Sequence, residues 1–272
     1  MKKHLSTVVM VLAFLTGFSL LLYPTVSNWW NSMHQSRAIA TYSDTVTNLN
    51  EEDYEQVWAA AREYNAALPE KTNRFYLTDE ERAEYERLMN VGGNGVMGYI
   101  EIKKIGVMLP LYHGTDEAVL QVAVGHIEGS SLPTGGLGTH SVFSGHRGLP
   151  SAKLFTNLDQ MEVGDKFILH VLDEKLTYEV DQILVVLPEE LEALEIDPEA
   201  DLCTLVTCTP YGVNSHRMLV RGHRVETEAE KAPVRIVTDA QVLDWWIVAL
   251  ALAVPMVILV YVFSSIKVGK KR

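Results

Sequence analysis

Three short stretches of the sequence hold side chains that could carry out acyl transfer. Residues 143–148 read FSGHRG, residues 204–210 read TLVTCTP and residues 214–217 read NSHR. Their reactive groups are the thiol of Cys208, the imidazole of His146 and the guanidinium of Arg217. A thiolate can attack a carbonyl, an imidazole can hold and return a proton, and a guanidinium can stabilise the developing oxyanion. These three residues form the candidate catalytic set.

Cys208 lies where a strand is expected to end. The β-branched run 203–208 predicts a strand, and the TPYG sequence at 209–212 predicts a turn directly after it. Arg217 follows Cys208 by nine residues. An antiparallel return strand would therefore bring the guanidinium beside the thiol, where a cation favours the thiolate.

Cys203, the other of the two cysteines, is not expected to form a disulfide with Cys208. Five steps along a strand put the two side chains on opposite faces, roughly 16 Å apart. A disulfide needs Cα atoms within about 7 Å. A free cysteine is more often a small buried apolar side chain than a nucleophile, and this alternative stays open at this point.

His146 is the best candidate base among the nine histidines, because it lies between two glycines in a loop that follows an expected strand. His4 falls in the expected N-terminal tail, and His34 falls near the expected membrane surface. The remaining histidines are expected to be solvated or hydrogen-bonded parts of the fold: His113, His126, His140, His170, His216 and His223.

Apolar periodicity predicts the helices and strands that hold these residues. Residues 31–90 have helical character, with Asn50 as a plausible cap of one helix and a capping box that starts at Thr78 and opens a second helix through Leu88. Beyond residue 90, short apolar runs between Gly, Pro and charged turns predict seven or more strands, which favours a barrel or a sandwich. The expected strands span residues 97–102, 107–112, 139–144, 166–172, 175–186, 203–208 and 217–224.

Two uncharged apolar runs, at residues 5–23 and 245–266, are each long enough to cross a bilayer as a helix. Basic residues lie outside both runs, which predicts cytoplasmic termini and an extracellular middle. Tryptophans flank the runs on the expected outer side, as is typical of membrane interfaces: Trp29, Trp30, Trp245 and Trp246. A cleaved signal peptide is the alternative for the first run, and it would also export the middle.

These patterns predict a two-pass protein of the cell membrane with one extracellular catalytic body. The expected parts are a cytoplasmic tail (1–4), a transmembrane helix (5–24), a helical arm with a possible lid region (25–90), a catalytic barrel (91–228), a linker (229–243), a second transmembrane helix (244–266) and a basic tail (267–272).

The charge of the chain argues against nucleic acid as a partner. The formal net charge is −12. Without the six basic residues of the two tails, 17 Lys and Arg face 35 Asp and Glu, a net charge of about −18.

No Cys and His cluster has zinc spacing, and no metal or cofactor is expected. The acidic stretch 189–201 could bind Ca²⁺, but its spacing matches no compact oxygen cage and fits a solvated surface better.

The candidate residues also carry a family resemblance. The series TLVTCTPYGVNSHR at 204–217, preceded by SGHRG at 144–148, resembles the sortase signature of a Thr-Leu-x-Thr-Cys strand with a downstream Arg and an upstream His. The similarity covers roughly residues 90–225 and is closest to the class C, pilin-polymerising group. The second apolar run also fits that group.

The resemblance implies a fold and a reaction. Sortases adopt a closed eight-stranded β-barrel, so the fold class expected here is mainly β, with a helical arm and two flanking transmembrane helices. The resemblance assigns Cys208 as nucleophile, His146 as acid or base and Arg217 as stabiliser of the oxyanion and substrate. Its substrates would be proteins with an LPXTG-like sorting signal, cleaved between Thr and Gly through a thioester. In class C the acceptor amine resembles a pilin lysine.

The sequence departs from the class C pattern at the lid. Class C enzymes commonly have an Asp-Pro-aromatic motif upstream of the barrel, whereas the single Asp-Pro of this chain is Asp197-Pro198, far downstream. The lid position holds LPE at 68–70 and RFY at 74–76. Either Phe75 or Tyr76 substitutes for the motif, or the protein has no lid of this kind.

Three further functions remain open at this level. A membrane-anchored binding module would have an unreactive Cys208. A thiol hydrolase would pass the acyl group to water. A housekeeping-type sortase would attach proteins to the cell wall.

Overall fold

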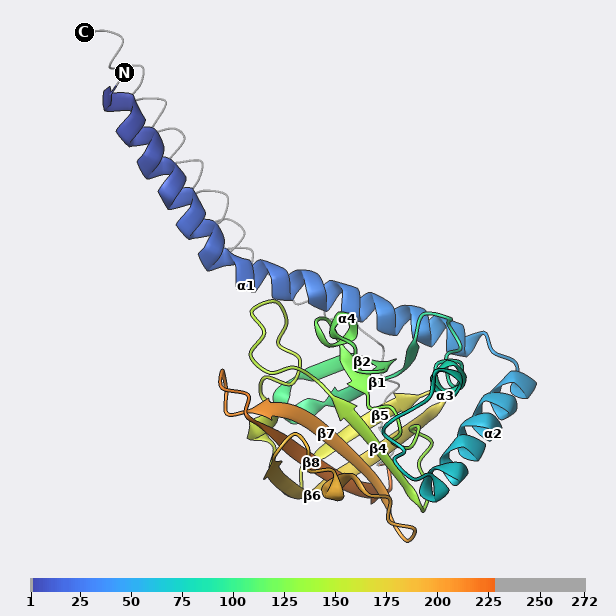
Figure 1. Ribbon diagram of the computed structural model, residues 1–272. Helices are drawn as coiled ribbons and strands as arrows, with labels where there is room; N and C mark the ends of the chain where they lie inside the picture. Colours follow the sequence, from blue (N-terminus) through green and yellow to red (C-terminus); the bar gives the residue numbers. More distant parts are fainter. Residues whose placement is uncertain (1, 228–272) are drawn as a thin grey trace.

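The computed structural model describes residues 2–227, and the predicted linker, second transmembrane helix and basic tail lie outside this range. It consists of a long N-terminal helix, a short helical region and a closed β-barrel (Figure 1). The barrel and the apolar N-terminal helix confirm the predicted fold class for the described part of the chain. The limits of the predicted domains stay predictions.

Helix α1, Lys2–Thr47, runs without interruption through Pro24. The predicted boundary at residue 24 between span and arm therefore falls inside one helix. Its N-terminal part projects beyond the barrel, and its later part lies along the barrel (Figure 1). From Val9 on, the helix is long and apolar enough to cross a membrane, with a mean hydropathy of 2.0 in its best window and none of that window buried. Farther along, Ile39, Tyr42 and Val46 are buried against the rest of the molecule.

Helices α2, Glu51–Ala67, and α3, Asp79–Tyr85, begin at the predicted caps. The side chain of Asn50 accepts a hydrogen bond from the backbone N of Asp53, and Thr78 forms the expected capping box with Glu81. Helix α3 ends at Tyr85, three residues before the predicted end, because the chain continues in tight turns to Met89, whose φ is 58°.

Eight strands close into the barrel in the order β1-β2-β3-β4-β7-β8-β6-β5. The β2–β3 and β4–β7 pairs are parallel, and the other pairs are antiparallel. The strand missing from the predicted list is β3, which is only three residues long and therefore too short to show a pattern. The strands are β1 Val96–Ile102, β2 Val107–His113, β3 Val124–His126, β4 Thr139–Ser144, β5 Lys166–Val171, β6 Glu174–Val186, β7 Asp201–Thr209 and β8 His216–Val225.

Short helical turns connect these elements. A small α-helix, α4 Glu117–Leu120, precedes β3, and four 3-10 turns complete the described chain. These turns are η1 Leu68–Glu70, η2 Lys103–Ile105, η3 Leu158–Gln160 and η4 Glu192–Leu194.

Within residues 2–227, the buried apolar side chains form two clusters, which meet the barrel wall from opposite faces. The larger cluster fills the interior, where it includes Phe143, Leu205 and Val220, and it also takes in buried side chains of α1, α2 and α3. The smaller one consists of Val142, Val206 and Leu219 from β4, β7 and β8, together with Leu194 from η4. Because side chains alternate along a strand, residues adjacent in sequence such as Leu205 and Val206 belong to different clusters. We call the smaller one the outer-face cluster.

Candidate active site

Cys208 and Arg217 are direct partners across the antiparallel β7–β8 pair. Directly opposite residues in a sheet share a face and have Cβ atoms about 5 Å apart. The turn between the strands is closed by hydrogen bonds from the backbone N of Val213 and of Asn214 to Pro210 O, at 3.1 and 3.0 Å. The nine-residue spacing in the sequence is thus realised as a cross-strand pair at the end of the barrel.

The guanidinium of Arg217 is held by the turn itself. Its Nη1 donates to the carbonyl oxygens of Asn214 and His216, at 3.2 and 3.1 Å. Both Cys208 and Arg217 are half-buried, so the thiol can be reached from solvent while its surroundings stay partly desolvated.

The two cysteines occupy different environments. Cys203 is fully buried in the interior cluster, whereas Cys208 lies on the outer face, and both are free thiols. The alternation along β7 thus puts them on opposite faces, as the sequence predicted. Burial raises the pKa of the Cys203 thiol well above its ordinary value. Cys203 is therefore suited to packing and not to nucleophilic attack.

His146 reaches the same end of the barrel through the parallel β4–β7 pair. In the register Ser144 is opposite Val206, and Gly145 N donates to Val206 O at 3.0 Å. The hydroxyl of Thr207 donates to Gly145 O at 2.8 Å. When the β4–β7 register is extended two residues beyond Ser144 and Val206, His146 lies opposite Cys208. The structure therefore brings the three predicted residues to the ends of three neighbouring strands.

The loop after His146 packs tightly against neighbouring residues. A Cβ atom on Gly145 would meet the ring of Phe155 at 2.7 Å, so this position accepts only glycine without rearrangement. Phe155 N also donates to His146 O at 3.1 Å. On the other side, the ring of Tyr211 lies 5.8 Å from the Arg147 guanidinium. The β4–β5 and β7–β8 loops thus contact each other beside the candidate site.

The outer-face cluster leads along the barrel wall to Cys208. Val206 lies two residues before Cys208 on β7, and Leu219 lies two residues after Arg217 on β8, so both share the face of the candidate pair. Further apolar side chains pack on the cluster from β6 and from the β6–β7 connection: Leu184, Val186, Leu191 and Ala193. An apolar side chain of a peptide could bind on this face while its backbone reaches the thiol.

In the structure, this face is occupied by part of the chain itself. Phe75, from the segment before α3, packs on the outer-face cluster, whereas Tyr76 is 80% exposed. Of the two aromatic residues considered for the lid position, it is Phe75 that contacts the barrel.

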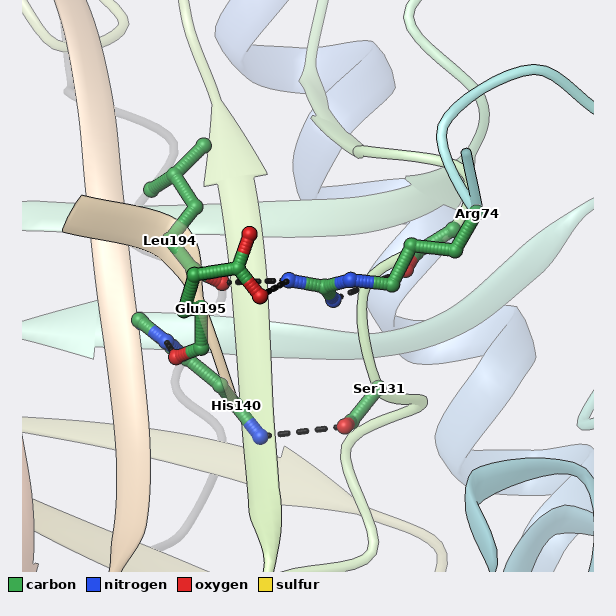
Figure 2. A network of polar contacts seen from close by, with 6 residues as sticks. Arg74, Ser131, His140, Leu194 and Glu195 are labelled. Atoms are coloured by element: carbon green, nitrogen blue, oxygen red, sulfur yellow. Dashed lines mark hydrogen bonds and ion pairs between the residues drawn. The ribbon is translucent and has the colours of Figure 1, made fainter. Parts of the chain in front are cut away.

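Arg74 fastens this segment to the β6–β7 connection (Figure 2). Its guanidinium donates to Gly129 O at 3.1 Å, to Leu194 O at 2.9 Å and to the Glu195 carboxylate at 3.4 Å. Gly129 has a φ of 83°, and a Cβ there would meet Arg74 O at 2.0 Å. Only glycine allows the two backbones to approach so closely. No pattern in the sequence predicted that Arg74 would be buried.

His140, on β4, also contacts the β6–β7 connection. Its Nδ1 lies 2.8 Å from Glu195 O, and its backbone N donates to Ser131 Oγ at 3.0 Å (Figure 2). Its Nε2 lies 2.7 Å from Thr204 Oγ1. Burial lowers the pKa of His140. This histidine is a hydrogen-bonded part of the fold, as expected, and it holds the β6–β7 connection on the barrel.

The other histidines make their contacts elsewhere in the fold, except that His216 pairs with Thr209, the residue after Cys208, in the β7–β8 register. His126 is fully buried between Tyr85 and Ser131, and His113 contacts the carbonyl oxygens of Gly95 and Leu88. His216 contacts Ser215, and His223 is partly exposed near Asp181. His170 stacks on Tyr99 and contacts Glu101.

The acidic stretch makes local hydrogen bonds. Glu190 accepts from Leu187 N, and Asp197 accepts from Glu199 N. Asp201 accepts from Gly136 N and from the Tyr178 hydroxyl. Within residues 2–227, no group of three or more His, Cys, Asp or Glu side chains is arranged to hold a metal ion.

A family model and several solved structures are similar to this chain. Residues 100–225 match the family model described as Sortase domain. Sortase C1 of Streptococcus agalactiae is 52% identical, with a TM-score of 0.69 over 71% of this chain and 100% of that chain. A structure of Clostridium perfringens sortase C with the C-terminal cell wall sorting motif is 40% identical, with a TM-score of 0.62 over 70% of this chain and 99% of that chain.

Curated relatives are more distant. Sortase D of Bacillus subtilis (strain 168) is 30% identical over 47% of this chain and 63% of its own length. Sortase A of Bacillus anthracis is 29% identical over 50% of this chain and 63% of its own length. The chain therefore spans less than two thirds of these two curated relatives.

Proposed function

The chain belongs to the sortase family, and on this premise we propose that it is a cysteine transpeptidase. It would cleave an LPXTG-like sorting signal of another protein between Thr and Gly and transfer the new acyl end to an amine. Cys208 is the proposed nucleophile, His146 the acid and base, and Arg217 the stabiliser of the oxyanion. The single observation that supports this most is the cross-strand pairing of Cys208 with Arg217, beside the strand end that carries His146.

The proposed reaction has two halves. The Cys208 thiolate attacks the carbonyl carbon of the threonine, and the oxyanion that forms accepts hydrogen bonds from Arg217. Protonated His146 gives its proton to the departing glycine nitrogen, which leaves a thioester on Cys208. An amine then loses a proton to His146 and attacks the thioester. The amide forms, the carbon–sulfur bond breaks, and the thiolate returns.

We propose the pilin-polymerising class, in which the amine is a pilin lysine. Support comes from the similarity to sortase C structures at 40–52% identity. Among them is a 40% identical sortase C of Streptococcus pneumoniae, a protein described in connection with pilin substrate specificity. Attachment of proteins to the cell wall is the second candidate, and the similarity to proteins named sortase A favours it.

We also propose that the Arg74–Phe75 segment covers the substrate-binding face. The support is that Phe75 packs on the outer-face cluster, while the Arg74 hydrogen bonds fix the segment to the β6–β7 connection. An incoming signal would have to displace Phe75. In this chain Arg74 and Phe75 would therefore cover the site in place of the missing Asp-Pro-aromatic motif.

The proposed location is the cell membrane, with two spans and the barrel on the extracellular face. The long apolar helix α1 supports an N-terminal anchor. The second span and the orientation are supported by the sequence alone: the second apolar run and the basic residues that flank both runs.

Mass spectrometry of the full-length protein mixed with sorting-signal peptides tests the proposed chemistry. We expect an acyl adduct on Cys208 with loss of the peptide that follows Thr. Addition of an amine should convert the adduct to an amide product. The variant Cys208→Ala should form neither, and Cys203→Ala, the matched control, should form both. Product formation by Cys208→Ala would refute the assignment.

Two further outcomes identify the alternatives. If a thiol reagent at neutral pH does not label Cys208 in the folded protein, the chain is a binding module. If the thioester forms but passes only to water when amines and pilin subunits are present, the chain is a hydrolase.

A further inference from the structure

Helix α1 contacts the loop that carries His146. Helix α1 is continuous from its membrane-compatible part to the part that packs on the barrel. The Tyr42 hydroxyl fixes the packed part, because it donates to Met97 O at 3.0 Å and accepts from Leu172 N at 2.7 Å. The helix is therefore fixed relative to the barrel, and its side chains can hold other segments in place.

Two asparagines on this helix bind the β4–β5 loop. Asn28 Oδ1 accepts from the backbone N of Lys153 at 3.0 Å, and Asn31 Nδ2 donates to the backbone O of Ser151 at 2.9 Å. The two asparagines are three residues apart and so lie on one side of the helix. Between the two bonded loop residues, Ala152 is buried in the interior cluster.

The bound segment connects directly to His146. Phe155 N donates to His146 O at 3.1 Å, and Gly148 N donates to Thr156 Oγ1 at 3.2 Å, so the loop closes on itself at its base. Leu154 has a φ of 34°, an uncommon value for a non-glycine residue, and its side chain is buried. Such a conformation persists where the surroundings determine it. The loop is thus held at one end by α1 and carries the imidazole at the other.

We propose that Asn28 and Asn31 are positioning residues, through which the membrane-anchor helix sets the place of His146 relative to Cys208. This inference rests on the proposed role of His146 in proton transfer. Asn28 follows the predicted apolar run by five residues, roughly 8 Å along a helix axis, so the contact lies next to the bilayer surface. A chain without these residues would keep the barrel core but lose two of the contacts that order the catalytic loop.

The directions of the two hydrogen bonds provide a sharp test. Asn28 uses its oxygen, so Asn28→Asp keeps the acceptor and should preserve the contact. Asn31 uses its nitrogen, so Asn31→Asp places a carboxylate against a carbonyl oxygen and should break it. The two variants carry the same change of charge and of side-chain volume, at positions one helical turn apart. They therefore serve as controls for each other.

The experiment uses full-length protein in lipid nanodiscs and measures two properties. Steady-state kinetics with a sorting-signal peptide and an amine give kcat, KM and their pH profiles, and hydrogen exchange reports the protection of residues 148–156. We expect kcat to fall about 10-fold for Asn31→Asp and for Asn28→Ala, with little change in KM, a changed pH profile and faster exchange of the loop. Asn28→Asp should match the unmodified protein in all of these.

Three results would overturn the proposal. The first is equal behaviour of Asn28→Asp and Asn31→Asp. The second is faster loop exchange with unchanged kcat and pH profile, which would make the contact purely structural. The third is unchanged exchange in Asn28→Ala and Asn31→Asp. Failure of the proposed function would look different, because Cys208→Ala would then still form product whatever the loop does.

Discussion

The hydroxyl of Thr207 donates a 2.8 Å hydrogen bond to the carbonyl oxygen of Gly145, and so joins the residue before Cys208 to the residue before His146. Both Thr207 and Gly145 are buried. Sixty-two residues separate them along the chain. This bond therefore fixes the spacing of the proposed nucleophile and base at the end of the parallel β4–β7 pair.

Replacing Thr207 by Val should slow catalysis by loosening this spacing. The side chain keeps its shape, but Gly145 O loses its buried donor, at a cost of about 1–2 kcal/mol of stability. We expect the single-turnover rate of thioester formation to fall about 10-fold. Thr204→Val is the control, because Thr204 lies on the same strand as Thr207 and its hydroxyl also bonds a buried partner, His140 on β4. It should lose similar stability with an unchanged rate, and equal slowing of both variants would contradict this prediction.

Arg217→Ala should reduce kcat by about 10² to 10³, because removal of an oxyanion donor usually has an effect of this size. Arg221→Ala is the matched control on the same face of β8, where Arg221 forms a partly exposed ion pair with Asp181 at 3.0 Å. Its loss should cost less than about 1 kcal/mol of stability and leave kcat unchanged. Both effects are measured by kinetics and thermal melting. A similar kcat for the two variants would argue against a role of Arg217 in stabilising the oxyanion.

Phe75→Ala should make the substrate-binding face more accessible. The substituted side chain would no longer occupy the outer-face cluster, so we expect a several-fold lower KM for the signal peptide and faster labelling of Cys208 by a thiol reagent. Tyr76→Ala, at the exposed neighbouring position, should change neither value. If Phe75→Ala raises KM, the ring is part of the binding surface for the peptide and does not cover it.

Acid should destabilise the protein through buried His126. Burial lowers the pKa of His126 to about 3, whereas an unfolded histidine has a pKa of about 6.5. Between these values the unfolded chain binds a proton that the folded chain does not, so stability falls as the pH drops below 6.5. At pH 5 the loss should be about 2 kcal/mol.

Thermal melting of the detergent-solubilised protein between pH 7.5 and 5 measures this loss. His113 and His140, whose pKa values burial also lowers, act in the same direction. The variant His126→Gln should show a smaller drop with pH, because one of the three groups is gone. An unchanged drop in this variant would mean that His126 is not responsible.

Features that depend on near neighbours could be predicted from the sequence. The caps at Asn50 and Thr78 follow from single side chains next to a helix start. The opposite faces of Cys203 and Cys208 follow from the two-residue period of a strand, and the pairing of Cys208 with Arg217 follows from a short antiparallel turn. Each of these is decided within about ten residues, where local conformation and hydrogen bonding suffice.

Contacts between distant segments became apparent only in the folded barrel. Parallel pairing of β4 with β7 brings His146 level with Cys208, and no local pattern specifies which strands pair in this way. The same holds for Phe75 on the outer-face cluster, for Arg74 beneath the β6–β7 connection, and for Asn28 and Asn31 on the catalytic loop. These side chains carry no signal of their own, because their partners are fixed only when the barrel closes and competing positions are excluded by packing.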